Sequence, residues 1–227
     1  VDLYYTILLS FTISEYSLKG YEAVKNKLDE IEKYQINRLN ANYAFLTENE
    51  RETYKCLFDN NIAPINSVYI LANSPDSRKK LYNNTIATKV IALYANENIR
   101  NYLGTLNDSL QNEYFSTIKQ RDSIENIGKN KFAMGNEEFG NSILLKEKAI
   151  QKGISSKPGF IQFDPRAIKW NNISTSLKEK EIAIEFVHSN INNSEHYFAL
   201  VITKDIQAPE LIPLFEEPAL KKILNQQ

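Results

Sequence analysis

The chain has 227 residues, of which 42% are hydrophobic and 24% are charged, and its formal net charge at pH 7 is -1. This composition is typical of a globular protein with one large or two small domains, and it excludes a disordered tail. A net charge so close to zero gives no electrostatic reason to expect a nucleic acid or an anionic membrane as partner.

Up to about residue 150, apolar residues recur every three or four positions, which predicts one helix after another. The opening run at 1–14 is apolar, but it is far too short to span a bilayer and no basic residues precede it. Residues 16–43 predict an amphipathic helix, because the inner positions recur every three or four residues while Lys, Asp and Glu fill the other face. These inner positions are Tyr21, Val24, Leu28, Ile31 and Gln35.

A signal for the start of a helix lies at Thr47, which is followed three residues later by Glu50 in the arrangement of a capping box. This signal predicts a helix over 46–58. Its inner face is expected to carry Tyr54, Leu57 and Phe58.

A longer helix is predicted to begin with Ser74 as its N-cap and Pro75 at its first helical position, and to stop at Gly104. Two more helices are predicted over 106–128 and over 136–153, with a loop between them. The buried stripe of the first of these two is expected at Leu110, Tyr114, Ile118 and Ile124.

Near residue 153 the spacing of apolar residues changes from helical to alternating, and alternation predicts strands. A turn-rich connector over 153–165 leads to a short amphipathic helix over 166–177, which carries the single tryptophan. An antiparallel hairpin is expected next, with strands over 181–188 and 196–204 and a polar loop between them.

The alternation places Ile182, Ile184 and Phe186 on one face of the first strand and Ala183, Glu185 and Val187 on the other. The second strand alternates likewise, with Phe198, Leu200 and Ile202 opposite Tyr197, Ala199 and Val201. A third strand is predicted over 209–215, where the flanking prolines suit a sheet edge. Pro218 then lies near the start of a last helix, over 217–224.

Six stretches of the sequence carry a family resemblance. KGYEAVKNKLDEIEK resembles the second helix of a tetratricopeptide unit, with Gly20, Tyr21, Ala23 and Leu28 at signature-like positions. YAFLTENERETY resembles a phrase found just after such repeats, and KLYNNTIATKVIAL with LNDSLQNEYFSTIKQ resembles long bridging helices. IKWNNISTSLKEKEIAIEFV and YFALVITKDIQAPELIPLFEEPALKKIL resemble the start of a caspase-like domain. In this order the stretches resemble bacterial proteins that join tetratricopeptide repeats to a caspase-like peptidase domain called CHAT.

The resemblance implies a mostly α fold of stacked antiparallel helices, degenerate and tetratricopeptide-like, followed by a small α/β portion that begins a caspase-like sheet. It divides the chain into a helical repeat and bridging region, 1–152, and an incomplete CHAT domain, 153–227. The family's catalytic histidine and cysteine end later core strands, so neither role passes to a residue of this chain. We therefore expect a non-catalytic scaffold or regulatory portion of a CHAT-type protein. The alternative is a fragment of an active cysteine endopeptidase whose catalytic His and Cys lie beyond Gln227.

The residues that could carry chemistry are few. One cysteine excludes an internal disulfide, which fits a reducing compartment, and we expect a cytoplasmic protein. Cys56 has no histidine nearby on its predicted helix, and a half-buried packing role is preferred to that of a nucleophile. His188 and His196 flank the hairpin loop and with Glu195 suggest a surface metal site, although two histidines without a third fixed ligand are more often solvated. We expect no catalytic residue, no cofactor and no metal.

The expected partners follow from the arrangement of the elements. Stacked helix pairs form concave grooves, so a protein or peptide is expected to bind the helical region. The 13 Tyr and 11 Phe lie at helical spacing, which favours a core over a surface that stacks nucleic-acid bases. Strands that are apolar on at least one face need cover and paired edges. We therefore expect that the sheet either pairs edge to edge with a second copy through its open edge or is less protected from hydrogen exchange than the helices. Neither nucleic acid nor membrane is expected as partner.

Overall fold

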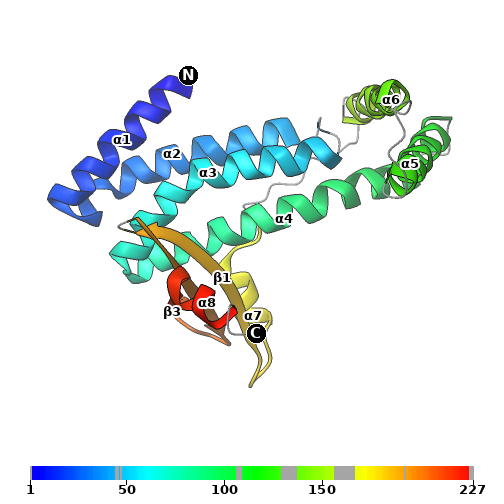
Figure 1. Cartoon of the computed structure of the whole chain (residues 1–227). Helices are drawn as coiled ribbons and strands as arrows, with labels where there is room; N and C mark the ends of the chain where they lie inside the picture. Colours follow the sequence, from blue (N-terminus) through cyan, green and yellow to red (C-terminus); the bar gives the residue numbers. More distant parts are fainter. Residues whose placement is uncertain are drawn as a thin grey trace. The chain divides into compact units, whose positions relative to one another are not determined.

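The computed structural model of the chain describes residues 2–43, 46, 48–105, 109–128, 137–155, 167–191 and 193–224 (Figure 1). These residues are mostly helical, with a three-stranded antiparallel sheet near their C-terminal end. The predicted fold class, helices followed by a small α/β part, is confirmed. No helix in these ranges is both long and apolar enough to cross a membrane.

The helices are α1 (Asp2–Lys19), α2 (Tyr21–Tyr43), α3 (Glu48–Ala72), α4 (Pro75–Thr105), α5 (Ser109–Gly128), α6 (Glu137–Ser155), α7 (Trp170–Ser176) and α8 (Glu217–Leu224). The strands are β1 (Ile182–Ile191), β2 (Ser194–Thr203) and β3 (Glu210–Glu216). The chain forms two compact units. We call Val1–Arg38, Leu57–Val90 and Pro165–Gln227 the sheet unit, and Leu39–Cys56 and Ile91–Asp164 the helical unit. The division predicted at residue 152 stays a prediction.

The helix predicted over 16–43 is in fact two helices, which meet at Gly20. This glycine has a φ of +78°, and its N–H donates to the carbonyl oxygen of Tyr16 at 2.8 Å. A left-handed residue of this kind ends a helix, and only glycine adopts it without steric cost. The predicted stripe of α2 is confirmed at Tyr21, Val24, Leu28 and Ile31, all buried. It continues at Ile36 and not at Gln35, because the apolar side chain takes the core position while the amide stays partly exposed.

The helix predicted over 46–58 extends to Ala72 and contains Pro64. Proline and the asparagines before it are poor helix formers, so the sequence does not reveal the second half of this helix. The inner face follows Phe58, Ile62, Ile65 and Tyr69, which are all buried. The prediction that Leu57 faces inward is wrong, because this position lies off that stripe and is 56% exposed. The predicted cap Thr47 lies outside the described residues.

The start of α4 is confirmed at atomic detail. The N–H of Ser77 donates to the Ser74 Oγ at 3.1 Å, and the N–H of Ser74 donates to the Ser77 Oγ at 2.9 Å. This reciprocal pair satisfies backbone donors that the first helical turn leaves open. Pro75 is the first helical residue, and the helix ends at Thr105, one residue after the predicted stop.

The helical unit has a core formed by α4, α5 and α6. Leu103, Tyr114, Ile150 and Ile154 are buried together there, and Tyr102 and Ile118 pack against them. The predicted stripe is therefore confirmed at Tyr114 and Ile118. The side chains of Leu110 and Ile124 lie outside the described part of the chain, as does the predicted loop after Gly128.

The sheet has the order β1-β2-β3, with both neighbouring pairs antiparallel. The strands of the hairpin are longer than predicted, because Ile191 pairs with Ser194 and only two residues turn the chain. Asn193 has a φ of 62°, a left-handed conformation that asparagine tolerates better than most residues. The predicted third strand and last helix are confirmed at β3 and α8. Of the amphipathic helix predicted over 166–177, the structure shows Trp170–Ser176.

Candidate interaction surfaces

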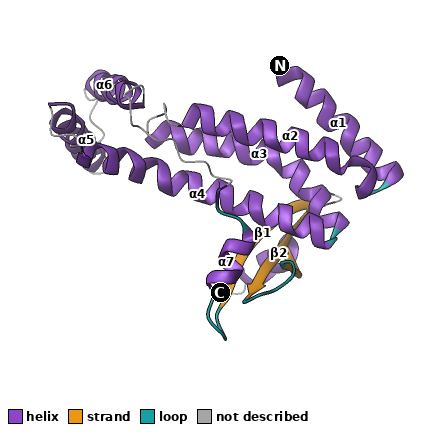
Figure 2. Cartoon of the chain, turned by 180° about the vertical axis from the view of Figure 1, so that it is seen from behind, coloured by secondary structure: helices purple, strands orange, loops and turns teal. Residues whose placement is uncertain are grey.

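The inner face of the sheet is fixed to helices of the same unit (Figure 2). Ser189 on β1 lies with its Oγ 2.6 Å from the Oγ of Ser67 on α3. Glu185 on β1 forms an ion pair with Lys89 on α4. Ser174 on α7 donates to the carbonyl oxygen of Thr203 at 2.9 Å. These contacts come from one row of β1 and from the end of β2, so they decide which side of the sheet faces the helices.

The other face of the sheet carries exposed apolar side chains on its two outer strands. Ile182, Ile184 and Phe186 on β1 are 57%, 43% and 67% exposed, and we call these three residues the β1 row. The register places Phe186 beside Ala199 of β2, and Ala199 beside Ile212 of β3, which is 42% exposed. Residues that stand opposite each other share a face, so one apolar surface crosses all three strands. Ala199 itself is only 5% exposed, so the exposed apolar side chains lie on β1 and β3, on either side of it. Exposed apolar residues grouped in this way are typical of an interaction site.

The two histidines do not come together. Their register partners are Tyr197 for His188 and Ser189 for His196, so the two rings lie on opposite faces of the hairpin. His188 Nδ1 is 3.1 Å from the Oε2 of Glu195, and the hydrogen bond from His188 holds the pKa of this carboxyl below its usual range. The suggested site of two histidines and Glu195 is therefore wrong. Among the residues that the structure describes, no three His, Cys, Asp or Glu side chains are grouped to hold a metal ion.

Cys56 is exposed on α3, so the prediction of a half-buried packing residue is wrong. It lies beside Leu57 on the outer side of the helix, two positions before the inward-facing Phe58. A position one or two residues away from an inner residue is turned by 100° or more around an α-helix, which explains the exposure.

A stripe of exposed apolar residues runs along α1. We call it the α1 stripe, and it contains Leu3, Ile7, Phe11 and Leu18, which are 72%, 47%, 70% and 84% exposed. Spacings of four and seven residues place these side chains on one side of the helix. The opposite side of α1 contacts α2, where the rings of Tyr5 and Tyr34 stack with their centroids 3.7 Å apart. The sequence predicted helices throughout 1–150 but gave this segment no bounds of its own, and it did not predict the exposed stripe.

A polar cluster joins α2, α3 and α4 inside the sheet unit. Tyr69 donates through its hydroxyl to the Glu32 Oε2 at 2.7 Å, and the Asn84 Nδ2 donates to the same oxygen at 3.3 Å and to the Asn66 Oδ1 at 3.2 Å. Tyr69 and Asn84 are 0% and 1% exposed. Burial raises the pKa of Glu32, and the Tyr69 hydroxyl and the Lys80 ammonium oppose that rise. The cluster is a structural feature of the helix interface, and sequence reasoning did not find it.

Replacing Glu32 by glutamine is expected to stabilise the protein at neutral pH. Because burial raises the folded-state pKa of Glu32 above its ordinary value of 4.5, the protonated carboxyl favours the folded state below that value, and this contribution is lost as the pH rises through the folded pKa. Glutamine accepts the same hydrogen bond without a charge. Urea unfolding at pH values from 4 to 8 is expected to show that Glu32→Gln has a higher free energy of unfolding than the unmodified chain, and that the difference grows with pH. An equal gain at every pH would contradict this explanation.

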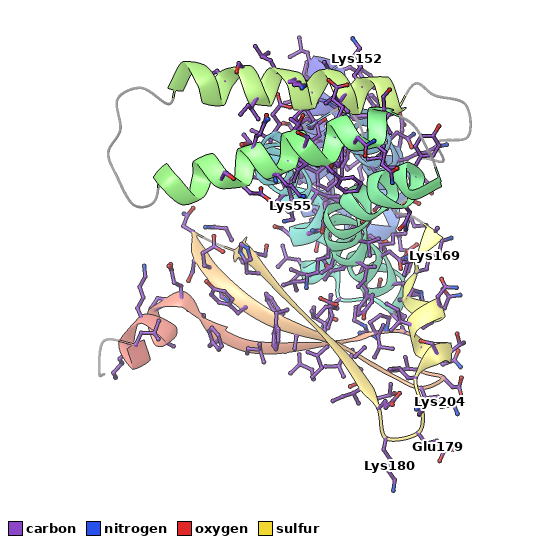
Figure 3. All side chains as sticks on the ribbon, turned by 90° about the vertical axis from the view of Figure 1, so that its right-hand side faces the viewer. Lys55, Lys152, Lys169, Glu179, Lys180 and Lys204 are labelled. Carbon is purple, nitrogen blue, oxygen red and sulfur yellow. The ribbon has the colours of Figure 1, made fainter. Side chains whose placement is uncertain are left out.

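The charged end of the sheet gives no patch of a single sign. Figure 3 shows Glu179, Lys180 and Lys204 near the same end of the sheet, where β1 begins and β2 ends. Acidic and basic side chains are mixed there, so their charges largely cancel and the electrostatic potential around this end of the sheet is weak. This end of the sheet does not form the basic surface that a nucleic acid would need.

The candidate interaction surfaces are therefore the apolar outer face of the sheet and the α1 stripe. The face of the sheet is defined by the exposure of its side chains and the strand register, and the α1 stripe by exposure and helical spacing. Comparisons with protein-family models, with curated proteins and with solved structures gave no match.

Proposed function

We propose that this chain is a non-catalytic helical scaffold that binds a protein or peptide partner, and that it works as the regulatory portion of a CHAT-type protein in the cytoplasm. The observation that carries the binding role is the α1 stripe, whose apolar side chains are exposed at helical spacing. The resemblance of the sequence to tetratricopeptide and CHAT proteins supports the family assignment.

A partner with an apolar helical face fits the α1 stripe best. Large exposed apolar side chains are costly in water, and burying them against another apolar surface stabilises a complex by about 25 cal/mol for each Å² removed from water. Side chains at intervals of four and seven residues match an amphipathic helix laid along α1. Phe11 is expected to contribute most, because it combines an aromatic ring with 70% exposure.

Binding is tested with a display library of amphipathic helical peptides screened against the whole chain. Peptides selected on the unmodified protein are expected to bind Phe11→Ser roughly tenfold or more weakly, as for an aromatic residue at the centre of an interface. Leu145→Ser is the matched control, because Leu145 is 69% exposed on α6 and lies outside the α1 stripe. Equal binding by Phe11→Ser and the unmodified chain would exclude the α1 stripe as the binding site.

Catalysis is tested separately with a fluorogenic peptide library. The purified chain is expected to leave the peptides intact, because a cysteine nucleophile needs a base at hydrogen-bond distance. Cleavage that disappears in Cys56→Ala would contradict the non-catalytic role and favour a peptidase. Cleavage that survives in this variant would indicate a contaminating enzyme.

A further inference from the structure

The two edges of the sheet differ in how well they can accept another strand. The edge strand β3 contains Pro213, which has no backbone N–H to donate, and its register with β2 shifts between Tyr197 and Phe198. Proline and bulges are devices that protect sheet edges from pairing. The strand β1 runs for ten residues from Ile182 to Ile191 with no proline or glycine, and its pairing with β2 is regular throughout. Among the described strands, only β2 pairs with β1.

The side chains of β1 carry almost no charge that would oppose a second strand. Glu185 is the one acidic or basic residue of the strand besides His188, and its carboxylate pairs with Lys89 on the inner face. Lysine residues that commonly protect exposed edges are absent from β1. The outer face presents the exposed β1 row directly beside the unpaired edge.

We propose that β1 pairs antiparallel with the β1 of a second copy of this chain, so that two sheets of three strands become one continuous sheet. Antiparallel pairing about a two-fold axis brings the same residues together from both copies. A register centred on Phe186 places the two phenylalanine rings side by side, Ile184 beside His188, and Glu185 beside Val187. Each of these pairs is free of like charges, and aromatic cross-strand pairs are among the favourable ones.

A second copy fits this edge because the strand is complementary to itself. Pairing satisfies the outward backbone groups of both strands at once, and it joins the two β1 rows into one apolar surface. Registers centred on Glu185 are disfavoured, because they set two carboxylates opposite each other. The dimer forms through β1 and does not involve the α1 stripe. The dimer proposal can therefore be tested independently of the proposed binding of a partner to the α1 stripe.

Sedimentation velocity of the whole chain over a range of concentrations tests the dimer. The mass is expected to rise from that of the 26.2 kDa chain towards twice this value. Phe186→Lys is expected to weaken the dimer roughly tenfold or more, because it sets two ammonium groups opposite each other at the centre of the pairing. Since Phe186 is 67% exposed, the folded monomer is expected to tolerate lysine, and the circular dichroism spectrum checks this.

Ile212→Lys is the matched control. Ile212 lies on the same face but on β3, and it is 42% exposed. A dimer that Phe186→Lys weakens and Ile212→Lys leaves intact supports pairing through β1. Equal loss in both variants would mean that the sheets pack face to face, and a monomer at every concentration would exclude the dimer; either result overturns the proposal.

Disulfide trapping gives a second test that does not depend on a charged substitution. In a Cys56→Ser background, Phe186→Cys is expected to form a covalent dimer under mild oxidation, because opposite Cα atoms in an antiparallel pair lie about 4.5–5.5 Å apart, within the range that a disulfide spans. Ile212→Cys in the same background is expected to stay monomeric. A covalent dimer of the Ile212→Cys variant, with the Phe186→Cys variant remaining monomeric, would overturn the proposed edge.

Discussion

Replacing Arg121 by methionine is expected to lower the free energy of unfolding of the helical unit by about 3 kcal/mol, the usual cost of breaking a buried ion pair from one side. The Arg121 Nη1 lies 3.2 Å from the Oε1 and 3.3 Å from the Oε2 of Glu147, and it joins α5 to α6. The two side chains are 12% and 1% exposed, so the remaining carboxylate would lose this cation and gain little water in return. Hydrogen exchange of the α5 and α6 amides, together with urea unfolding, measures the loss.

Two controls identify the cause of this loss. The double variant Arg121→Met/Glu147→Met removes both charges and is expected to cost clearly less than the sum of the single variants. Lys146→Met removes a similar connection between α6 and α5, the pair with Glu113 at 3.4 Å, but both of those side chains are about half exposed. An exposed pair contributes at most about 1 kcal/mol, so this variant is expected to change little. Equal losses for Arg121→Met and Lys146→Met would contradict the role of burial.

Tyr69→Ala is expected to destabilise the sheet unit by about 4 kcal/mol, since removing a buried aromatic side chain leaves a cavity. Tyr69 is fully buried, and its hydroxyl is a donor to the Glu32 carboxylate at 2.7 Å. Burial, together with that carboxylate, raises the pKa of Tyr69 far above its ordinary range, so the hydroxyl keeps its proton and remains a donor. Tyr69→Phe keeps the ring and loses the hydrogen bond, which is expected to cost about 2 kcal/mol at pH 7.

The pH dependence of Tyr69→Phe separates the hydrogen bond from the packing. Because the hydroxyl stabilises the ionised Glu32, its loss is expected to cost less as the pH falls and the carboxyl becomes protonated. Tyr82→Phe is the matched control on α4, since Tyr82 is 1% exposed and its hydroxyl has no hydrogen bond within the part of the chain that the structure describes. Denaturant unfolding between pH 4 and pH 8 makes this comparison. A pH-independent cost for Tyr69→Phe would rule out the link to Glu32.

Local signals predicted most of the fold. Ser74 and Pro75 mark the start of α4 because a side-chain cap and a missing N–H act within one turn of the helix. Alternation likewise located β1 and β2, since a half-buried strand exposes every second residue, while the flanking prolines indicated β3. The second half of α3 was missed because Pro64 opposes a helix locally, while the burial of Ile65 and Tyr69 favours it through contacts distant in sequence.

The candidate surfaces were harder to predict, because exposure depends on which face of an element finds a neighbour. Alternation separated Phe186 from Glu185 but could not tell which of them meets the helices. The ion pair of Glu185 with Lys89 decides this, and it joins residues 96 positions apart. The cluster around Glu32 depends in the same way on three helices meeting, which no local pattern reports.

The two-residue turn of the hairpin has a consequence for how this protein can change during evolution. Strand residues alternate between faces with a period of two, so one residue inserted within β1 next to Ile191 would exchange the faces of the residues that precede it. Such an insertion would bring Phe186 towards the helices and expel Glu185 from its contact with Lys89. Insertions and deletions of two residues keep the faces of β1 and are therefore tolerated better than those of one residue. Homologues are expected to differ in this hairpin by even numbers of residues.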